Sequence, residues 1–450
     1  MGGFELSLIF FGVMLVMIFL RMPIGVALFL TGFFGIWVIL DTPSMVMNNM
    51  KSLTYETFSN YNLSIVPMFL LMGQFATKSG MSEGLFRAAA DWLGHRKGGM
   101  AMASVGACAG FGAVCGSSLA TASTMGQVAL PEMRRYGYSG RLATGVLAAG
   151  GTLGILIPPS VILVIYAIEA EQNIAKMFAA ALIPGLLAAL GYILTVAIYA
   201  RLSPADAASL PRKPWGERLR GLVGVLPVIV IFGLVMWGIA GDSNWNKSGQ
   251  QALFSPTEGA AVGAVLTGLF GLLNGGLNWK SFLDCVLKAA STSAMIFFIL
   301  FGAKVFNAFL ALTQTPQGLA DWVTTQGFSP LMILTLMLSL YLVFGCVMDS
   351  LSMILLTIPI FFPIIEALDF GMSAEDTAIW FGILALIVVE VGLITPPVGM
   401  NLFIISSMAK DVPITETYKG VAPFVLSDMI RVVILVSFPA ITLWLVHLVF

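Results

Sequence analysis

The sequence contains few charged residues and very little histidine. Asp, Glu, Lys and Arg together make up 10% of the 450 residues, and the only two histidines are His95 and His447. One lies in a predicted loop and the other at the C-terminal edge, so they form neither a metal-binding cluster nor a Ser–His pair. The Gly-x-x-x-x-Gly-Lys-Ser/Thr loop that binds nucleotide phosphates is also absent. These absences argue against an enzyme, and they leave an ion gradient or passive flow to drive any transport.

Two further signatures are missing. The four cysteines lie in or beside apolar segments, and none has zinc-binding or redox spacing, so we interpret them as small packing residues. They are Cys108, Cys115, Cys285 and Cys346. No basic leader and no small-residue cleavage site accompany the first apolar stretch. Residues 6–20 are therefore predicted to form a retained helix and not a cleaved signal peptide.

Apolar residues, by contrast, make up 58% of the chain. Soluble globular domains do not reach this share. Apolar runs of roughly 17 to 25 residues, long enough to cross a bilayer as helices, recur along the whole sequence. The chain is therefore predicted to be an all-α polytopic membrane protein with about ten spanning helices. We expect them at residues 4–20, 23–40, 62–78, 141–169, 177–200, 221–239, 258–275, 284–309, 377–407 and 421–449.

Two more apolar stretches, 99–131 and 331–367, carry small or polar residues at their midpoints. Each is long enough to enter the membrane and turn back. A turn at that depth is tolerated only where protein or water meets the exposed backbone groups. We predict that both stretches form re-entrant hairpins.

The basic residues indicate how the chain is oriented. Lys and Arg accumulate in cytoplasmic loops of membrane proteins. When the N-terminus is placed outside, most of the 22 Lys and Arg residues fall on the cytoplasmic side, many of them within 78–97, 134–141 and 201–220. Both chain ends are therefore predicted to lie outside.

Two widely separated segments repeat one another. Residues 153–160 read Leu-Gly-Ile-Leu-Ile-Pro-Pro-Ser, and residues 391–398 read Val-Gly-Leu-Ile-Thr-Pro-Pro-Val. A proline pair removes two backbone donors and leaves carbonyls of the preceding turn without partners. Hydrocarbon tolerates such carbonyls only where protein, water or an ion meets them. We therefore predict two helices, over 141–169 and 377–407, that are broken at their prolines.

Each predicted hairpin is followed by one of these broken helices, and the predicted direction reverses between the two halves. Such inverted repeats with discontinuous helices place a substrate and ion site near the bilayer midplane. The first repeat is expected at 62–200 and the second at 284–450. Residues 1–61 are expected to form N-terminal scaffold helices and an arm outside the membrane, and 201–283 a linker and further scaffold helices.

The midpoint of the first hairpin is rich in glycine and hydroxyl groups. A turn at Gly116 would let the backbone approach a ligand closely. A helix restarting after it would direct free N–H groups at an anion, to which Ser117, Ser118 and Thr121 add hydroxyls. With Ser350 and the break prolines Pro158 and Pro396, these residues are the candidate substrate site.

The second hairpin carries a carboxylate, Asp349, at its midpoint. A bound cation would offset the cost of burying this charge. Oxygens of Asp349, Ser350 and Thr395, with carbonyls near Gly392, suit Na⁺, a hard cation that takes oxygen ligands. The matching site in the first half would use carbonyls near Ser117 and Gly154.

Each of these features also has a structural interpretation. Glycine and serine commonly serve close helix packing in membranes, and proline commonly makes a simple kink. Their recurrence in the same order in both halves favours a transport site. Two other deep charges, Lys304 and Glu390, are expected to pair with each other or with carbonyls, although either could relay protons or meet the substrate.

Five motifs together resemble the large membrane subunit of tripartite ATP-independent periplasmic (TRAP) transporters, over the whole chain. They are Asn62-Leu-Ser-Ile-Val-Pro-Met-Phe-Leu-Leu-Met-Gly73, Gly151-Thr-Leu-Gly-Ile-Leu-Ile-Pro-Pro-Ser160, Ser255-Pro-Thr-Glu-Gly-Ala-Ala261, Met348-Asp-Ser-Leu-Ser-Met-Ile-Leu-Leu-Thr357 and Gly392-Leu-Ile-Thr-Pro-Pro-Val-Gly-Met-Asn401.

The resemblance implies a sodium-coupled secondary importer of the bacterial inner membrane. Its substrate would be a small organic acid such as sialic acid or a C4-dicarboxylate. Na⁺ would be its coupling ion. It would use no organic cofactor and bind no nucleic acid. The partners implied are a separate small four-helix membrane subunit and a periplasmic substrate-binding protein. The fold implied is that of elevator-type ion transporters, with a mobile domain of hairpins and broken helices. The loops 41–60, 240–257 and 310–330 would face the binding protein.

Two other functions stay open on the sequence alone. A stand-alone sodium/divalent-anion symporter also has paired hairpins and inverted halves, and it would transport without a binding protein. A channel or structural membrane scaffold would use the broken helices merely as kinks. The sequence does not distinguish which organic acid is carried.

Overall fold

The computed structural model describes residues 2–239 and 253–450, and every regular element in these two ranges is helical. The all-α prediction is therefore confirmed for this part of the chain. The N-terminal elements are α1 (Gly3–Phe19), α2 (Ile24–Leu40), α3 (Pro43–Phe58), the 3₁₀ turn η1 (Tyr61–Ser64), α4 (Ile65–Lys78) and α5 (Met81–Leu93).

Two segments that were expected to be loops contain helices. Residues 43–58 form α3, in which only Val46, Met50 and Thr57 are buried. Its composition is too polar to contain an apolar run of membrane-spanning length. Pro43 in its first turn nevertheless favours the start of a helix. Within 310–330 the structure has α15 (Thr315–Thr325). Of the third expected loop, 240–257, residues 240–252 lie outside the described residues.

Both predicted hairpins are confirmed as pairs of helices. The first consists of α6 (Gly99–Cys115) and α7 (Ser118–Arg135), and the second of α16 (Pro330–Gly345) and α17 (Ser350–Glu366). The turns fall at residues 116–117 and 346–349, where the sequence concentrates small and polar residues. Their depth in a bilayer stays a prediction.

Both broken helices are confirmed as well. The first consists of α8 (Gly140–Leu156) and α9 (Val161–Glu169), whose axes differ by 45°. The second consists of α18 (Ala374–Gly392) and α19 (Met400–Met408). The proline pairs lie in the two interruptions, where the missing backbone donors prevent the helices from continuing.

Within residues 2–239 and 253–450, four helices are long and apolar enough to cross a membrane, namely α10 (Ile174–Leu202), α13 (Pro256–Leu273), α14 (Trp279–Leu312) and α20 (Ile414–Ser437). The pair α8 and α9, and the pair α11 (Trp215–Leu222) and α12 (Leu226–Ile239), each qualify as one bent span. The remaining elements are η2 (Pro204–Asp206) and α21 (Ala440–Val449). The count of about ten crossings stays a prediction.

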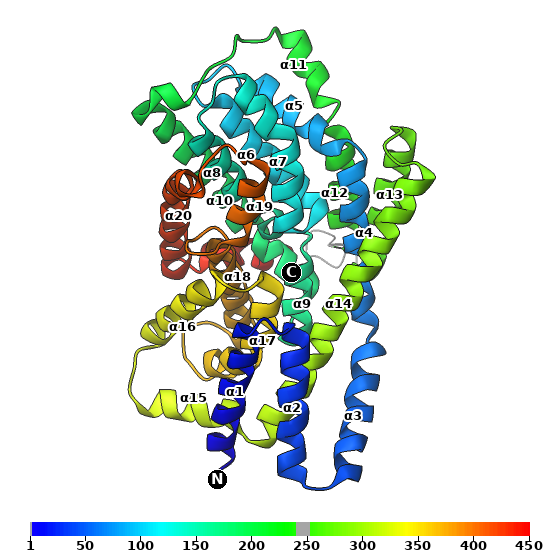
Figure 1. Cartoon of the computed structure of the whole chain (residues 1–450), viewed down its shortest axis with the longest axis vertical. Coiled ribbons are helices and arrows are strands. Elements are labelled where there is room, and N and C mark those ends of the chain that lie inside the picture. The colour runs from blue at the N-terminus through cyan, green and yellow to red at the C-terminus, as the bar shows by residue number, and fades with distance from the viewer. Residues whose placement is uncertain (1, 240–252) are drawn as a thin grey trace.

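Two groups of helices can be distinguished side by side. Figure 1 shows α3, α4, α13 and α14 along one side of the molecule and α6, α8, α16 and α18 toward the other, with α9 between them. The long helix α14 packs against α2 and α4, while α6 and α7 pack on α8, and α16 and α17 pack on α18. The candidate site residues of both halves therefore belong to one of the two groups.

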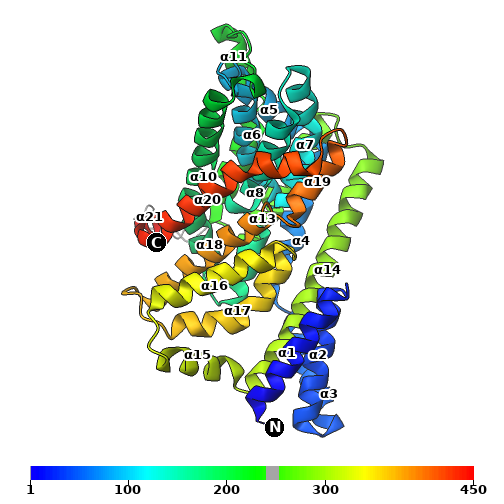
Figure 2. The same ribbon diagram turned by 60° about the vertical axis from the view of Figure 1, so that its left-hand side comes forward.

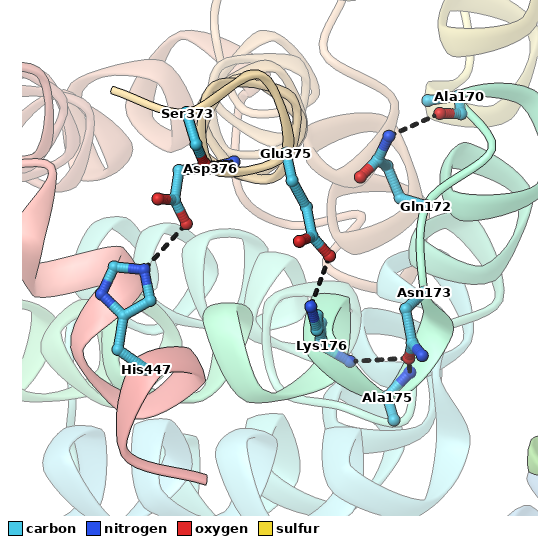
Figure 3. Close-up of polar contacts among 9 residues, drawn as sticks. All are labelled: Ala170, Gln172, Asn173, Ala175, Lys176, Ser373, Glu375, Asp376 and His447. Atoms are coloured by element: carbon cyan, nitrogen blue, oxygen red, sulfur yellow. Dashed lines mark hydrogen bonds and ion pairs between the residues drawn. The ribbon is translucent and has the colours of Figure 1, made fainter. Parts of the chain in front are cut away.

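An exposed ion pair joins the two halves at one edge of the molecule. Lys176 Nζ, in the first turn of α10, lies 2.5 Å from Glu375 Oε1 at the start of α18 (Figure 3). The neighbouring Asp376 Oδ1 lies 2.8 Å from His447 Nε2 on α21. Ser373 caps α18 by accepting a hydrogen bond from the Asp376 N–H. The start of α18 is thus held between α10 and α21.

Candidate site at the hairpin tips and helix breaks

The turn of the first hairpin is pressed against the first helix break. Gly116 ends α6 with a φ of +64°, a left-handed conformation that glycine adopts without steric cost. A methyl group added to it would lie 2.9 Å from the Pro159 carbonyl oxygen. Ser117 then caps α7 by accepting a hydrogen bond of 3.4 Å from the Ala120 N–H. Pro158, the predicted residue of this break, is buried directly before Pro159.

Three of the predicted residues meet at one point. A methyl group added to Gly154 on α8 would lie 2.3 Å from Thr121 Oγ1 and 2.6 Å from the Ser117 carbonyl oxygen. Thr121 is fully buried beside the Cys115 thiol, and its hydroxyl oxygen completes no hydrogen bond among the described residues. A buried hydroxyl without a hydrogen-bond partner is unfavourable. Its oxygen and the nearby carbonyl are ligands that a hard cation accepts.

The second hairpin tip is arranged differently. Asp349 is the N-cap of α17, where one carboxylate oxygen accepts from the Ser352 N–H at 3.0 Å and the other from the Ser352 hydroxyl at 2.6 Å. Thr395 donates its hydroxyl to the Val391 carbonyl at 2.6 Å. Among the described residues no hydrogen bond joins Asp349 to Thr395. The predicted second cation site is therefore not assembled in the way that its first counterpart is.

The turn of the second hairpin nevertheless contacts the second break. A methyl group added to Gly392 would lie 2.6 Å from the Gly345 Cα. The Gly399 N–H donates to the Cys346 carbonyl at 3.2 Å, and the Cys346 thiol lies 3.7 Å from the Pro396 carbonyl oxygen. The methyl position on Gly392 thus faces the end of the first arm of its hairpin, whereas that on Gly154 faces the start of the second arm of the other hairpin.

Lys304 and Glu390 are predicted to pair with each other or with carbonyls, and the mutual pairing is wrong. Lys304 Nζ, on α14, lies 3.4 Å from Glu169 Oε1 at the end of α9. Glu390 is fully buried on α18 and accepts a hydrogen bond of 2.7 Å from the Ser350 hydroxyl. The predicted residue Ser350 therefore contacts a carboxylate, but that carboxylate is Glu390 and not Asp349.

Sequence reasoning missed a buried polar network behind the first break. The Tyr192 hydroxyl donates to Asp428 Oδ2 at 2.6 Å and lies 3.0 Å from Thr152 Oγ1, two residues before Gly154. Arg431 Nη2 lies 2.9 Å from Asp428 Oδ1, and both side chains are buried. Opposite charges three residues apart on one helix are a signal that could have indicated this pair.

Asn401 also went unnoticed, although it ends one of the motifs. Its amide nitrogen donates to the Ala148 carbonyl on α8 at 3.3 Å, and its carbonyl oxygen is buried without a hydrogen bond among the described residues. A methyl group on Gly151 would lie 3.1 Å from that nitrogen. The helix that follows the second break, α19, thereby contacts the first broken helix.

A cavity of about 870 Å³ lies along the second arm of the first hairpin. Thr124 and Gln127 on α7 line one wall, and Lys78, Arg87 and His95 lie around the rest. Thr124 is in the second turn of α7, whose first turn carries Ser118 and Thr121. The cavity therefore adjoins the helix that begins at the first tip.

The chain was compared with known proteins. The family profile described as "Tripartite ATP-independent periplasmic transporter, DctM component" matches residues 11–441. The C4-dicarboxylate TRAP transporter large permease protein DctM of Pseudomonas aeruginosa is 35% identical over 411 residues, which cover 90% of this chain and 91% of that protein. The sialic acid TRAP transporter large permease protein SiaM of Vibrio cholerae is 30% identical over 438 residues, 96% of either chain.

Two more distant proteins are also similar. The isethionate TRAP transporter permease protein DctMQ of Oleidesulfovibrio alaskensis is 28% identical over 97% of this chain and 66% of its own. The crystal structure of the Alcanivorax borkumensis YdaH transporter superposes with a TM-score of 0.63 over 89% of either chain, at 15% identity. The second likeness concerns the fold alone.

Proposed function

The chain belongs to the DctM family, the DctM components of tripartite ATP-independent periplasmic transporters, and from this premise we propose that it imports a small organic acid by sodium-coupled transport. It is a membrane transporter permease of the TRAP type. Within such a system, it would act with a small membrane subunit and receive its substrate from a periplasmic binding protein in the bacterial inner membrane.

The observation that carries the proposal is the buried Thr121 hydroxyl, which completes no hydrogen bond among the described residues. It faces the Ser117 carbonyl and Gly154, where a hairpin tip meets a broken helix. Discontinuous helices commonly supply carbonyls and hydroxyls to coupling ions in transporters built from inverted repeats. We propose that Na⁺ binds to these oxygens. A second Na⁺ would bind near Asp349, Gly392 and Thr395, if Thr395 turns from Val391 toward the ion.

The substrate is proposed to be an organic acid because relatives are named for C4-dicarboxylate, sialic acid and isethionate. Its anionic group would lie between the hairpin tips. There, the first turn of α7 offers free backbone N–H groups next to Gly116 and Ser118, and α17 offers those next to Ser350. Pro158 and Pro396 would border this space from the two breaks.

We further propose an elevator movement of the hairpins and broken helices against the other group of helices. The two groups lie side by side in Figure 1, and Glu169 at the end of α9 meets Lys304 on α14 between them. This ion pair would form in one position of the mobile group and break in the other.

Uptake into proteoliposomes tests the proposal. They would contain this chain and its small subunit, with an inward sodium gradient and a binding protein loaded with a candidate acid. We expect accumulation that requires both sodium and the binding protein. Accumulation without the binding protein would instead support a stand-alone symporter. The absence of accumulation would support a channel or a structural scaffold.

Thr121→Val is expected to raise the sodium concentration for half-maximal uptake about tenfold, because it removes one cation ligand but keeps the shape of the side chain. Thr144→Val is the matched control. Thr144 is also buried on the same bundle, but its hydroxyl donates to the Gly140 carbonyl within its own helix. If Thr121→Val and Thr144→Val showed the same sodium dependence, Thr121 would not be a ligand of the proposed Na⁺ site.

Asp349→Asn is expected to weaken the sodium dependence of uptake while α17 stays folded. Asparagine can also cap a helix, so the variant removes the negative charge and keeps the N-cap of α17. Asp369→Asn, in the exposed loop after α17, removes a carboxylate that caps only its own turn and should leave uptake unchanged. Sodium activation of Asp349→Asn at the wild-type concentration would contradict a role for Asp349 in holding the ion.

A further inference from the structure

Glu390 stands between the two hairpin tips. Its Oε1 accepts a hydrogen bond of 2.7 Å from Ser350, the first residue of α17. The side chain of Ser118, the first residue of α7, interacts with the same carboxylate from the other hairpin. Ser118 and Ser350 hold equivalent positions in the two repeats, each directly after its helix cap. Figure 2 shows α18, which carries Glu390, between the first hairpin and α16 and α17.

Of the two carboxylate oxygens of Glu390, Oε1 accepts a hydrogen bond and Oε2 does not, among the described residues. Glu390 Oε2 is buried and accepts no hydrogen bond among the described residues, so Ser118 lies beside the carboxylate without completing that bond. A buried carboxylate oxygen without a donor is unfavourable. A small shift of the first turn of α7 that completed the bond would therefore be favourable.

Neither Lys304 nor Arg431 forms an ion pair with Glu390 that would explain its burial. Lys304 is paired with Glu169. Arg431 interacts with Glu390 through space, but its hydrogen-bonded partner is Asp428, at 2.9 Å on its own helix. Asp428 adds a second negative charge to the surroundings of Glu390. The groups that approach Glu390 most specifically are the two tip hydroxyls.

We propose that Glu390 is a positioning residue that couples the two hairpin tips, so that a cation bound at one tip favours binding at the other. This inference rests on the proposed function, in which each tip holds Na⁺. A cation held by the Ser117 carbonyl and Thr121 Oγ1 fixes the first turn of α7, and with it Ser118. Because Ser118 lies beside the carboxylate that accepts from Ser350, fixing Ser118 restricts Glu390 and hence Ser350, next to the Asp349 cap.

The test is equilibrium binding of radiolabelled sodium to the purified full-length chain in detergent, which requires neither substrate nor partners. Two coupled sites give a Hill coefficient that approaches about 2, and uncoupled sites one of about 1. We expect cooperative binding by the wild type and a Hill coefficient near 1 for Glu390→Gln, which has a single acceptor oxygen. Glu169→Gln, which also alters a buried carboxylate, is the matched control and should stay cooperative.

Two serine variants keep the test decisive if Glu390→Gln folds poorly. Ser118→Ala and Ser350→Ala each remove one hydroxyl, and each alone should lower the Hill coefficient as far as Glu390→Gln does. The coupling would be overturned if Ser118→Ala, Ser350→Ala or Glu390→Gln bound sodium cooperatively. It would also be overturned if the wild type bound sodium without cooperativity. Neither result would contradict sodium-driven uptake. A wild-type chain that binds no sodium would overturn the proposed function and the coupling together.

Discussion

Gly154→Ala is expected to abolish sodium-driven uptake. The added methyl group would lie 2.3 Å from Thr121 Oγ1 and 2.6 Å from the Ser117 carbonyl oxygen, distances that non-bonded atoms do not tolerate. The carbonyl belongs to the backbone and cannot rotate away as a flexible side chain would. The hairpin tip must therefore move off α8, which separates the oxygens that we propose as ligands. A displacement of about 1 Å at such a site costs about 100-fold in rate.

The measurement is the initial rate of uptake and its sodium dependence, in protein that elutes as a single species. Gly106→Ala is the matched control, since Gly106 lies on the same hairpin and the nearest atom to its added methyl group is 4.0 Å away. The control should transport like the wild type. If Gly154→Ala retained the wild-type rate and sodium half-saturation, the first cation site would have to lie elsewhere.

The sequence predicted the hairpins and the breaks well because their signals are local. Small and polar residues at 116–117 and 346–349 interrupt otherwise apolar stretches, and the proline pairs end α8 and α18 within a few residues. The helix α3 was missed for the opposite reason. Its amphipathic sequence has no apolar run, and its helical character depends on the few residues that it packs against neighbouring helices.

The candidate site could be predicted only in part, because its contacts join distant segments. Gly154 is predicted from the repeat as a cation-site residue and Thr121 from the hairpin midpoint as a substrate-site residue, and the structure brings them together. The sequence could not show that Ser350 would meet Glu390, since that depends on which side of α18 faces the hairpin. Asp349 is predicted as a cation ligand because of its charge. The structure shows that its carboxylate also caps α17, a role that any side-chain acceptor at this position could fill.

The missed network around Arg431 has the largest expected effect on stability. The side chains of Asp428 and Arg431 are 2% and 7% exposed, and they lie on α20, one of the helices long and apolar enough to cross a membrane. Removing the cation leaves a buried carboxylate held only by the Tyr192 hydroxyl. Breaking one member of a buried ion pair costs about 3 to 5 kcal/mol. Arg431→Leu is therefore expected to lower the melting temperature strongly or to reduce the yield of folded protein.

The exposed pair in Figure 3 provides the matched control. Lys176→Ala removes a cation from Glu375 at the edge of the molecule, where such pairs contribute about 0 to 1 kcal/mol. Its melting temperature should stay close to that of the wild type. The double variant Asp428→Asn/Arg431→Leu should recover most of the loss, because it removes the unpaired charge and keeps an acceptor for Tyr192. A single Arg431→Leu variant as stable as Lys176→Ala would mean that Asp428 does not need its buried partner, and that α20 is held in place by apolar packing alone.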